Sequence, residues 1–286
     1  MKFIQLAARV LSFGLSLSLS LGSSALAQAP QFGDEIYKPI RGQMGRDVMW
    51  LPTAQEHVIN LLKAAKVTAN DLVYDLGAGD GIITITAATE FGARSVGIEY
   101  HPKLAELARR NAQRVGVADK VNIITGDIFV ENFSAASVVT LYLLPELNLE
   151  LRPLLLKMKP GTRVLSNEFD MEEWQPDQTI TTQRAKGYLW IVPADVAGSW
   201  SLQGLSGPGS VTLRLSQRFQ KIEGQITQGQ QSYSLLGAQL MGEDIGFQFV
   251  DDKQRLHRVK ASVQGGVMVG EAVLAGESLA IKANRR

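Results

Sequence analysis

Acidic side chains recur at the ends of short apolar runs in the first half of this 286-residue chain. Asp75 and Glu99 each follow an apolar run directly, and Asp127 follows the next run after a short turn. If these runs are neighbouring parallel strands, their carboxyl ends meet at one edge of a sheet, where such folds bind ligands. Carboxylates gathered there accept hydrogen bonds from sugar hydroxyls and attract a positively charged ligand.

A glycine-rich turn follows the first of these runs and carries glycines at alternate positions: Gly77, Gly79 and Gly81. Glycine lets the backbone turn tightly and leaves no Cβ in the way of a ligand. A dinucleotide fingerprint needs a third glycine three residues after the second, and that position is Ile82. A pyrophosphate would also face Asp75 and Asp80, whereas the ammonium and sulfonium of S-adenosylmethionine (SAM) would find them favourable. SAM is therefore the expected cofactor, and a nicotinamide-dependent oxidoreductase is the disfavoured alternative.

The second and third acids have separate expected roles in holding a nucleoside. Glu99 lies about 20 residues beyond the first glycine of the turn, the offset at which an acid binds ribose hydroxyls. Asp127 could accept a hydrogen bond from an adenine amino group while Ile128 packs on the ring. The alternative for Asp127 is a solvated aspartate in a turn.

The elements that must position these residues alternate in type along the chain. Apolar runs predict strands at 72–74, 95–98, 121–124, 138–143 and 163–166. Helices are expected at 82–91 and from Pro102, although β-branched residues in the first favour a strand locally, because parallel strands need a crossover helix. The alternation predicts an α/β fold, a Rossmann-like sheet with helices on both faces.

Residues ahead of the first strand are expected to wrap and cover the domain. Residues 28–50 have few periodic cues, and the turn from Trp50 to Thr53 could line a pocket. Thr53 and Glu56 match a capping box that would start a covering helix.

The pattern changes beyond residue 175. Two strands at 179–183 and 188–192 could complete the first sheet, after which the sequence alternates apolar and polar residues between glycine-rich turns. Residues 28–195 are therefore assigned to the α/β domain. Residues 196–286 are assigned to a small antiparallel β domain, a meander forming a sandwich or partial barrel. It has no catalytic constellation, so it is a stabilising appendage or a docking module.

Composition excludes several classes of function. Lysine and arginine number 29 against 28 acids, so no bulk charge favours nucleic acid as a partner. The chain has no cysteine, which excludes disulfides, thiol nucleophiles and thiolate metal sites. The three histidines, His57, His101 and His257, are scattered without metal-ligand spacing, so no metal is expected.

The first 27 residues have the pattern of a signal peptide. Lys2 and Arg9 precede an apolar run at 10–21, and the small residues at 25–27 offer a cleavage site. This predicts export to the periplasm, away from the cytosol where SAM is made. An uncleaved anchor that holds the domain near a membrane on the cytosolic side is the alternative.

Several motifs resemble those of one enzyme class. The segments VYDLGAGDG, GIEY and GDIF resemble the cofactor motifs of class I SAM-dependent methyltransferases. TLYLLP, LRPLLLKMKPGTRV and FDM resemble a narrower branch, which holds bacterial methyltransferase-domain proteins and the mitochondrial lysine methyltransferase that acts on the c-ring protein of ATP synthase. The resemblance covers roughly residues 48–175. It implies that the turn from Asp75 to Gly81 holds the methionine part of SAM, through Asp75, Gly77, Gly79, Asp80 and Gly81. It also implies that Glu99 holds the ribose, and Asp127 with Ile128 the adenine.

The resemblance places the catalytic loop after the fourth strand, at 140–145. Many amine methyltransferases carry Asn or Asp followed by Pro-Pro-Tyr there, and this chain does not. Tyr142 and Pro145 are the candidates for shaping the approach of the substrate. A lysine acceptor must be neutral, yet its reference pKa is ~10.4, and a dry pocket would lower it. The expected function is methyl transfer to a protein amine, with an exported protein that binds an adenosyl ligand without catalysis as the alternative.

Overall fold

The structure is a computed structural model that describes residues 33–182, 185–205 and 210–286. The expected signal peptide at 1–27 lies outside these residues. The first sheet consists of strands β1 (Leu72–Leu76), β2 (Arg94–Glu99), β3 (Val121–Thr125), β4 (Val138–Leu141), β5 (Arg163–Asn167), β6 (Gln178–Thr181) and β7 (Lys186–Ile191). Their order is β3-β2-β1-β4-β5-β7-β6, with β1 to β5 parallel and β7 antiparallel to both β5 and β6.

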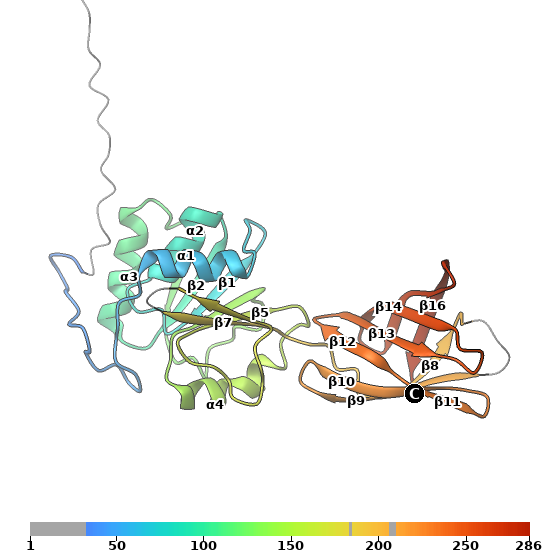
Figure 1. Ribbon diagram of the computed structural model, residues 1–286. Coiled ribbons are helices and arrows are strands. Elements are labelled where there is room, and N and C mark those ends of the chain that lie inside the picture. Colours follow the sequence, from blue (N-terminus) through green and yellow to red (C-terminus); the bar gives the residue numbers. More distant parts are fainter. Residues whose placement is uncertain (1–32, 183–184, 206–209) are drawn as a thin grey trace, which may run out of the picture. The chain divides into compact units, whose positions relative to one another are not determined.

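Helices cover both faces of this sheet, as the sequence predicts. Figure 1 shows α1 (Gln55–Ala64), α2 (Ile82–Phe91) and α3 (Pro102–Arg114) on one face and α4 (Pro145–Leu155) on the other. The Rossmann-like α/β fold is therefore confirmed. The order of strands reverses between β1 and β4, which in such sheets opens a crevice at the carboxyl ends of the strands.

Helix α2 forms although its β-branched residues favour a strand, because its position between two parallel strands decides. Gly81 precedes it at φ 84° and Gly92 ends it at φ 69°. The Thr84 hydroxyl donates to the Gly81 carbonyl at 2.9 Å, so this polar side chain is satisfied inside the helix.

The predicted capping box of α1 is wrong. The helix begins at Gln55, its N-cap is Ala54, and no side chain caps it. Thr53 is instead buried in the wall of a cavity, because the chain ahead of the helix runs along the ligand edge of the sheet.

The segment ahead of α1 wraps the domain, as expected. Asp34 accepts a hydrogen bond from Arg110 of α3, with 2.6 Å between Oδ2 and Nε, and Tyr37 stacks on His101. This segment is irregular apart from a bridge between Met44 and Met49.

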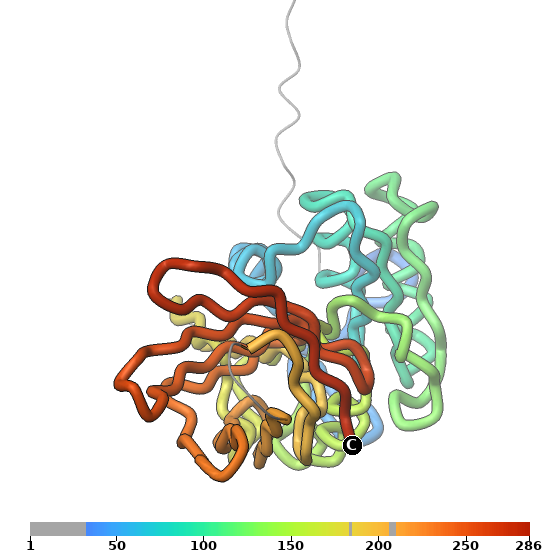
Figure 2. Tube along the Cα trace, turned by 90° about the vertical axis from the view of Figure 1, so that its right-hand side faces the viewer, coloured from blue at the N-terminus to red at the C-terminus, as the bar shows by residue number. Residues whose placement is uncertain are grey.

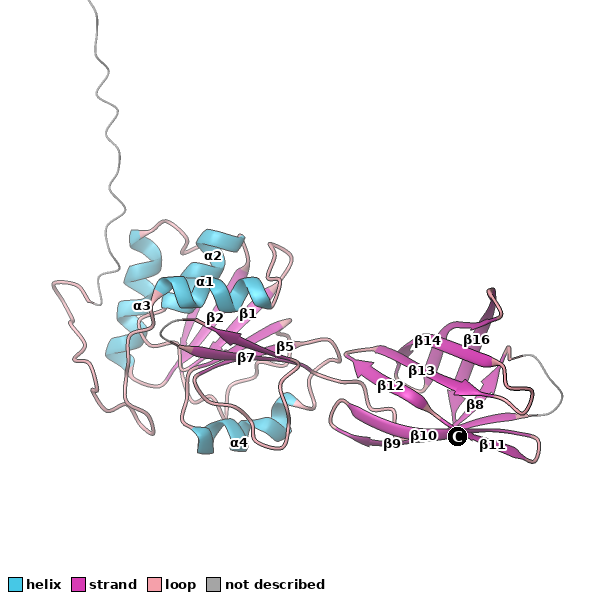
Figure 3. Ribbon diagram, viewed as in Figure 1, coloured by secondary structure: helices cyan, strands magenta, loops and turns pink. Residues whose placement is uncertain are grey.

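A second sheet holds nine antiparallel strands: β8 (Gly198–Gln203), β9 (Val211–Arg218), β10 (Lys221–Gln228), β11 (Gln231–Ser234), β12 (Leu236–Met241), β13 (Asp244–Val250), β14 (Leu256–Gln264), β15 (Val267–Leu274) and β16 (Glu277–Arg285). The order β11-β10-β9-β8-β16-β15-β14-β13-β12 leaves β11 and β12 at the edges. Figure 2 shows these strands curling around a common interior, and Figure 3 shows no helix among them. The interior is filled by apolar side chains such as Trp200, Phe247 and Phe249, which confirms a partial barrel.

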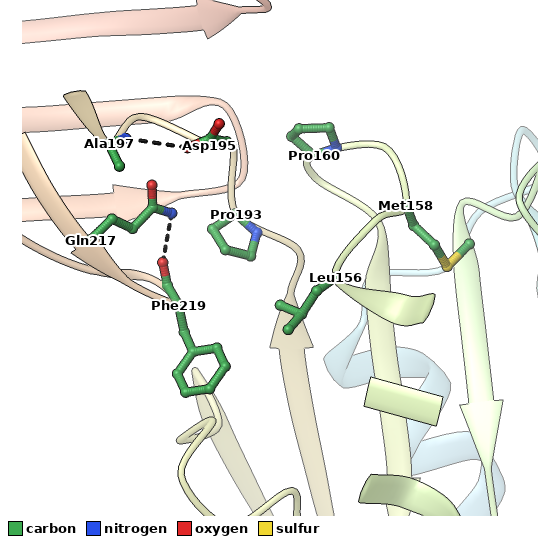
Figure 4. A pocket seen from close by; sticks show the side chains of 8 residues that line it. All are labelled: Leu156, Met158, Pro160, Pro193, Asp195, Ala197, Gln217 and Phe219. Carbon is green, nitrogen blue, oxygen red and sulfur yellow. Dashed lines mark hydrogen bonds between the residues drawn. The ribbon is translucent and has the colours of Figure 1, made fainter. Parts of the chain in front are cut away.

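Residues on either side of the predicted boundary at 195/196 are in contact. Phe219, in the turn after β9, stacks on Trp174 with ring centroids 6.2 Å apart, and Arg218 pairs with Glu173 at 2.9 Å. A cavity of about 380 Å³ beside this contact is lined by residues 156–160, 193–197, Gln217 and Phe219 (Figure 4). Its one acid, Asp195, pairs with Arg285 at 2.9 Å, so the cavity offers no uncompensated charge. None of the described helices is long and apolar enough to cross a membrane.

Candidate functional site

A cavity of about 270 Å³ opens at the carboxyl ends of the parallel strands. The glycine turn after β1 forms its floor, and the segment from Val48 to Thr53 forms one wall, so the prediction for that turn is confirmed. The ends of β2, β4 and β5 contribute Glu99, Tyr142 and Glu168. The cavity therefore spans the point at which the order of strands reverses.

Three carboxylates are buried at the glycine-turn end of this cavity. Asp75, Asp80 and Glu99 are 2%, 6% and 8% exposed, and all three line the cavity. Burial raises the pKa of Asp75 to about 7 and that of Asp80 to about 6, and it also raises the pKa of Glu99. The negative charge of Glu99 adds to the shift of the other two. Within the described residues no cationic side chain pairs with them, so a positively charged ligand would relieve this repulsion.

Hydrogen bonds hold these carboxylates in place. Asp75 Oδ1 accepts from the Thr140 hydroxyl at 2.6 Å. Glu99 accepts from the backbone N–H groups of Gly79 and His101, each at 2.8 Å. Gly77 donates its N–H to the Ile98 carbonyl at 2.9 Å. Because these amides already donate inside the protein, the turn can offer carbonyl oxygens to an ammonium but not these N–H groups to a phosphate.

The turn fits closely against the side chains above it. Gly77, Gly79 and Gly81 have φ of 87°, 57° and 84°, a conformation that other residues rarely adopt. A Cβ on Gly77 would lie 3.0 Å from Leu143, and one on Gly79 would lie 3.0 Å from the Trp50 ring nitrogen. The glycines therefore keep open a space that a ligand can enter.

A smaller adjoining cavity of about 60 Å³ lies at the end of β3 and shares Glu99 and Gly77 with the first. Asp127 and Ile128 line it, as expected for the adenine end. Asp127 accepts hydrogen bonds from the Phe129 N–H at 2.9 Å and from Arg46, and these two contacts lower its pKa. Arg46 also lies over the Tyr100 ring at 4.9 Å. The Asp127 carboxylate is therefore a partner of the wrapping segment, which the sequence did not indicate.

The opposite end of the main cavity is formed after β4 and β5. Tyr142, Leu144, Glu168 and Phe169 line it. Burial, and then the charge of Glu168, raise the pKa of the Tyr142 hydroxyl. Pro145 is not among the lining residues, and as the first residue of α4 it begins that helix.

Sequence reasoning missed two of the charged residues at this edge. Glu168 follows β5 as Glu99 ends β2, so an acid at a strand end was the available signal. Arg46 gave no signal, because it lies in an irregular segment and its contact with Asp127 spans 81 residues of sequence. No group of three or more His, Asp or Glu side chains in the described ranges is placed to hold a metal ion.

The order of strands, the glycine turn and the acid that ends β2 define a class I SAM-dependent methyltransferase, and the buried uncompensated carboxylates fit its cationic cofactor. The particular family follows from comparison with known proteins. Residues 75–178 match the family model of the ANTKMT methyltransferase domain. A protein-lysine N-methyltransferase of Saccharolobus islandicus (strain REY15A) is 41% identical over 151 residues, which are 51% of this chain and 94% of that protein. The chain belongs to this family of SAM-dependent lysine N-methyltransferases.

Two further relatives extend the comparison. The human lysine N-methyltransferase of the ATP synthase c-ring protein is 31% identical over 45% of this chain and 54% of that protein, so the chain spans about half the length of that relative. A crystal structure of an RNA methyltransferase from Salinibacter ruber, in complex with S-adenosyl-L-homocysteine, is 47% identical. It covers 51% of this chain and 96% of that chain, with a TM-score of 0.50. The matched regions lie in the α/β domain, which binds SAM as class I methyltransferases do.

Proposed function

We propose that this protein transfers a methyl group from SAM to the ε-amine of a lysine in a protein. The observation that carries the proposal is the 41% identity to a protein-lysine N-methyltransferase over nearly all of that enzyme's length. The structure supports it with a cavity that has an anionic end for the cofactor and a separate end at β4 and β5 for an acceptor.

The residues of the anionic end are suited to distinct parts of SAM. Asp75 and the carbonyl oxygens of the glycine turn would bind the ammonium of the methionine part, and Asp80 would add negative charge beside it. Glu99 would bind the ribose, and Asp127 with Ile128 would line the adenine end. Bound SAM supplies a methyl group that its sulfonium already activates.

The chain's own contribution is to align the acceptor and exclude water. Tyr142 and Leu144 stand at the acceptor end of the cavity, and Trp50 roofs the glycine turn. A lysine that enters this apolar space loses hydration, which lowers its pKa toward the neutral form that can attack. Tyr142→Phe tests whether the hydroxyl takes part, because unchanged turnover would remove it from the mechanism.

Incubation of the purified protein with methyl-labelled SAM and a cell extract tests the proposed function. We expect a labelled protein band that protease removes and ribonuclease leaves, and mass spectrometry of that band should show a methylated lysine. RNA is the second candidate acceptor, because the Salinibacter relative is an RNA methyltransferase. Labelling sensitive to ribonuclease alone would favour RNA, although the near balance of 29 basic and 28 acidic residues offers little attraction for it.

We also propose that the N-terminal segment directs export. Its basic start, apolar run and small-residue site support this. Alkaline phosphatase fused after Arg286 should be active in cells, and the mature chain should begin at Gln28. An inactive fusion with an intact N-terminus would instead indicate an anchor facing the cytosol.

A further inference from the structure

Glu168 occupies the half of the ligand edge that the cofactor residues leave unused. Along the sheet the strands run β2, β1, β4 and β5, and their carboxyl ends carry Glu99, Asp75, Tyr142 and Glu168 in that order. Glu99 and Asp75 lie on the side of the strand-order reversal that is suited to SAM. Glu168 lies on the other side, next to Tyr142, whose pKa its charge raises.

The backbone of Glu168 is held in a conformation that glutamate rarely adopts. Its φ is 67°, in the left-handed region that favours glycine. Hydrogen bonds fix the turn on both sides: Glu168 donates its N–H to the Lys186 carbonyl at 2.8 Å, and Phe169 donates to the Asn167 carbonyl at 2.9 Å. The Ser166 hydroxyl donates to the Phe169 carbonyl at 2.6 Å. A glutamate retained at a position where glycine would be less strained indicates that its side chain has a task.

The Glu168 carboxylate retains capacity for a cation. Its Oε1 accepts a hydrogen bond from the Lys186 N–H at 3.2 Å, and it makes no ion pair with any residue of the described ranges. An ionised carboxylate has about four acceptor sites, so most remain available to a ligand in the cavity.

The surroundings of this carboxylate are apolar. Leu51, Leu144 and Phe169 line the same end of the cavity, and Leu51 and Leu144 are partly exposed at its mouth. A ligand that fits has an aliphatic stem and a cationic tip, which is the build of a lysine side chain. A hydroxyl or a nucleobase would leave the carboxylate without a counter-charge.

We infer that Glu168 binds the ε-ammonium of the incoming lysine and guides it along the Leu51–Leu144–Phe169 channel to the methyl-transfer site. This rests on the proposed function and names a specificity-determining residue for it. Because a carboxylate favours the cation, Glu168 acts in recognition, and loss of the lysine proton follows as the amine moves toward the drier interior.

A binding experiment isolates the recognition of charge. Nα-acetyl-lysine methylamide and its neutral counterpart, Nα-acetyl-norleucine methylamide, are titrated into the full chain with S-adenosyl-L-homocysteine present, and binding is followed by NMR. We expect the wild type to bind the lysine compound about 10-fold or more tightly than the norleucine compound, as for a charge-assisted hydrogen bond. Glu168→Gln should remove this preference and leave SAM affinity unchanged. Equal binding by the wild type, or a preference that Glu168→Gln retains, would overturn the inference.

Turnover separates this inference from the proposed function. With the protein that the wild type labels in extract as substrate, Glu168→Gln should raise KM about 10-fold while kcat changes less than about 3-fold. Asp170→Asn, which removes an exposed carboxylate two residues away that does not line the cavity, is the matched control and should leave both values unchanged. Absence of any labelling by the wild type refutes the proposed function, whereas labelling with an unchanged KM in Glu168→Gln refutes the inference alone.

Discussion

At neutral pH the side chain of Asp75 is close to its own titration midpoint, because burial raises its pKa to about 7. The folded state therefore holds a proton that the unfolded chain releases near pH 3.8. Stability contributed by this proton is present at low pH and is lost as pH rises from about 4 to about 7, by at most about 1.4 kcal/mol per pH unit. Asp34, which Arg110 holds at a pKa of about 2, titrates below this window.

The same ionisation should control cofactor affinity with the opposite sign. SAM is cationic, so its affinity should rise between pH 5.5 and 7.5 as Asp75 and Asp80 ionise. Asp75→Asn should weaken SAM binding about 10-fold or more, and it should flatten the fall in the melting temperature of the ligand-free protein over the same range. Calorimetric titration and thermal melts measure both. Asp119→Asn, an exposed acid outside the cavity, is the control, and a pH-independent SAM affinity in the wild type would contradict the prediction.

Gly79 offers a second prediction at the scale of one residue. Gly79→Ala places a Cβ 3.0 Å from Trp50 and keeps a φ of 57°, so we expect lower stability and weaker SAM binding. Gly116→Ala has a similar φ of 75° but open space around its Cβ. This control should cost about 1–2 kcal/mol of backbone strain and leave SAM affinity unchanged. Equal SAM affinity in the two variants would show that Trp50 does not close the turn.

At the scale of elements, helix α4 supports the acceptor end through one buried side chain. Asn148 Nδ2 donates to the Ser166 hydroxyl at 3.1 Å and to the Phe169 carbonyl at 3.2 Å, on either side of Glu168. Asn148→Ala should cost about 1–3 kcal/mol in the free energy of unfolding and raise KM for the acceptor, because the turn that presents Glu168 loosens. Denaturant unfolding and initial rates measure these effects. Glu150→Ala, exposed on the same helix, should change neither, and a stability loss with an unchanged KM would separate α4 from the acceptor site.

The elements that the sequence predicted are those whose pattern is local. β1, β2 and β3 follow from apolar runs that end in acids or glycines, and α2 follows from the topology even against its propensity. Helix α4 has no counterpart among the predicted elements, because Pro153 interrupts its pattern. The acceptor end was out of reach for a related reason: Glu168 faces Tyr142 only because β5 pairs with β4, which is a long-range fact.

At the scale of the whole molecule, the α/β domain contains every residue assigned to the site. The Saccharolobus relative shows that such a domain suffices as a protein, since the aligned region makes up 94% of it. The β domain instead supplies Phe219, which stacks on the fully buried Trp174 and lies under Arg152 of α4 at 5.7 Å. Its local alternation predicted strands, but closure into a near-barrel depends on β16 returning to pair with β8, which no local pattern records.

A fragment of residues 33–195 tests this division of roles. It should fold and bind SAM within about 3-fold of the full chain, because the cavity lining is intact, and it should melt several degrees lower because Trp174 loses a contact of about 0.5–1.5 kcal/mol. Phe219→Ala in the full chain is the matched variant and should lower the melting temperature of the α/β domain in the same direction. Scanning calorimetry and SAM titration provide the readouts. A fragment that fails to bind SAM, beside a Phe219→Ala protein that binds it normally, would show that the β domain shapes the cofactor site through contacts other than this aromatic pair.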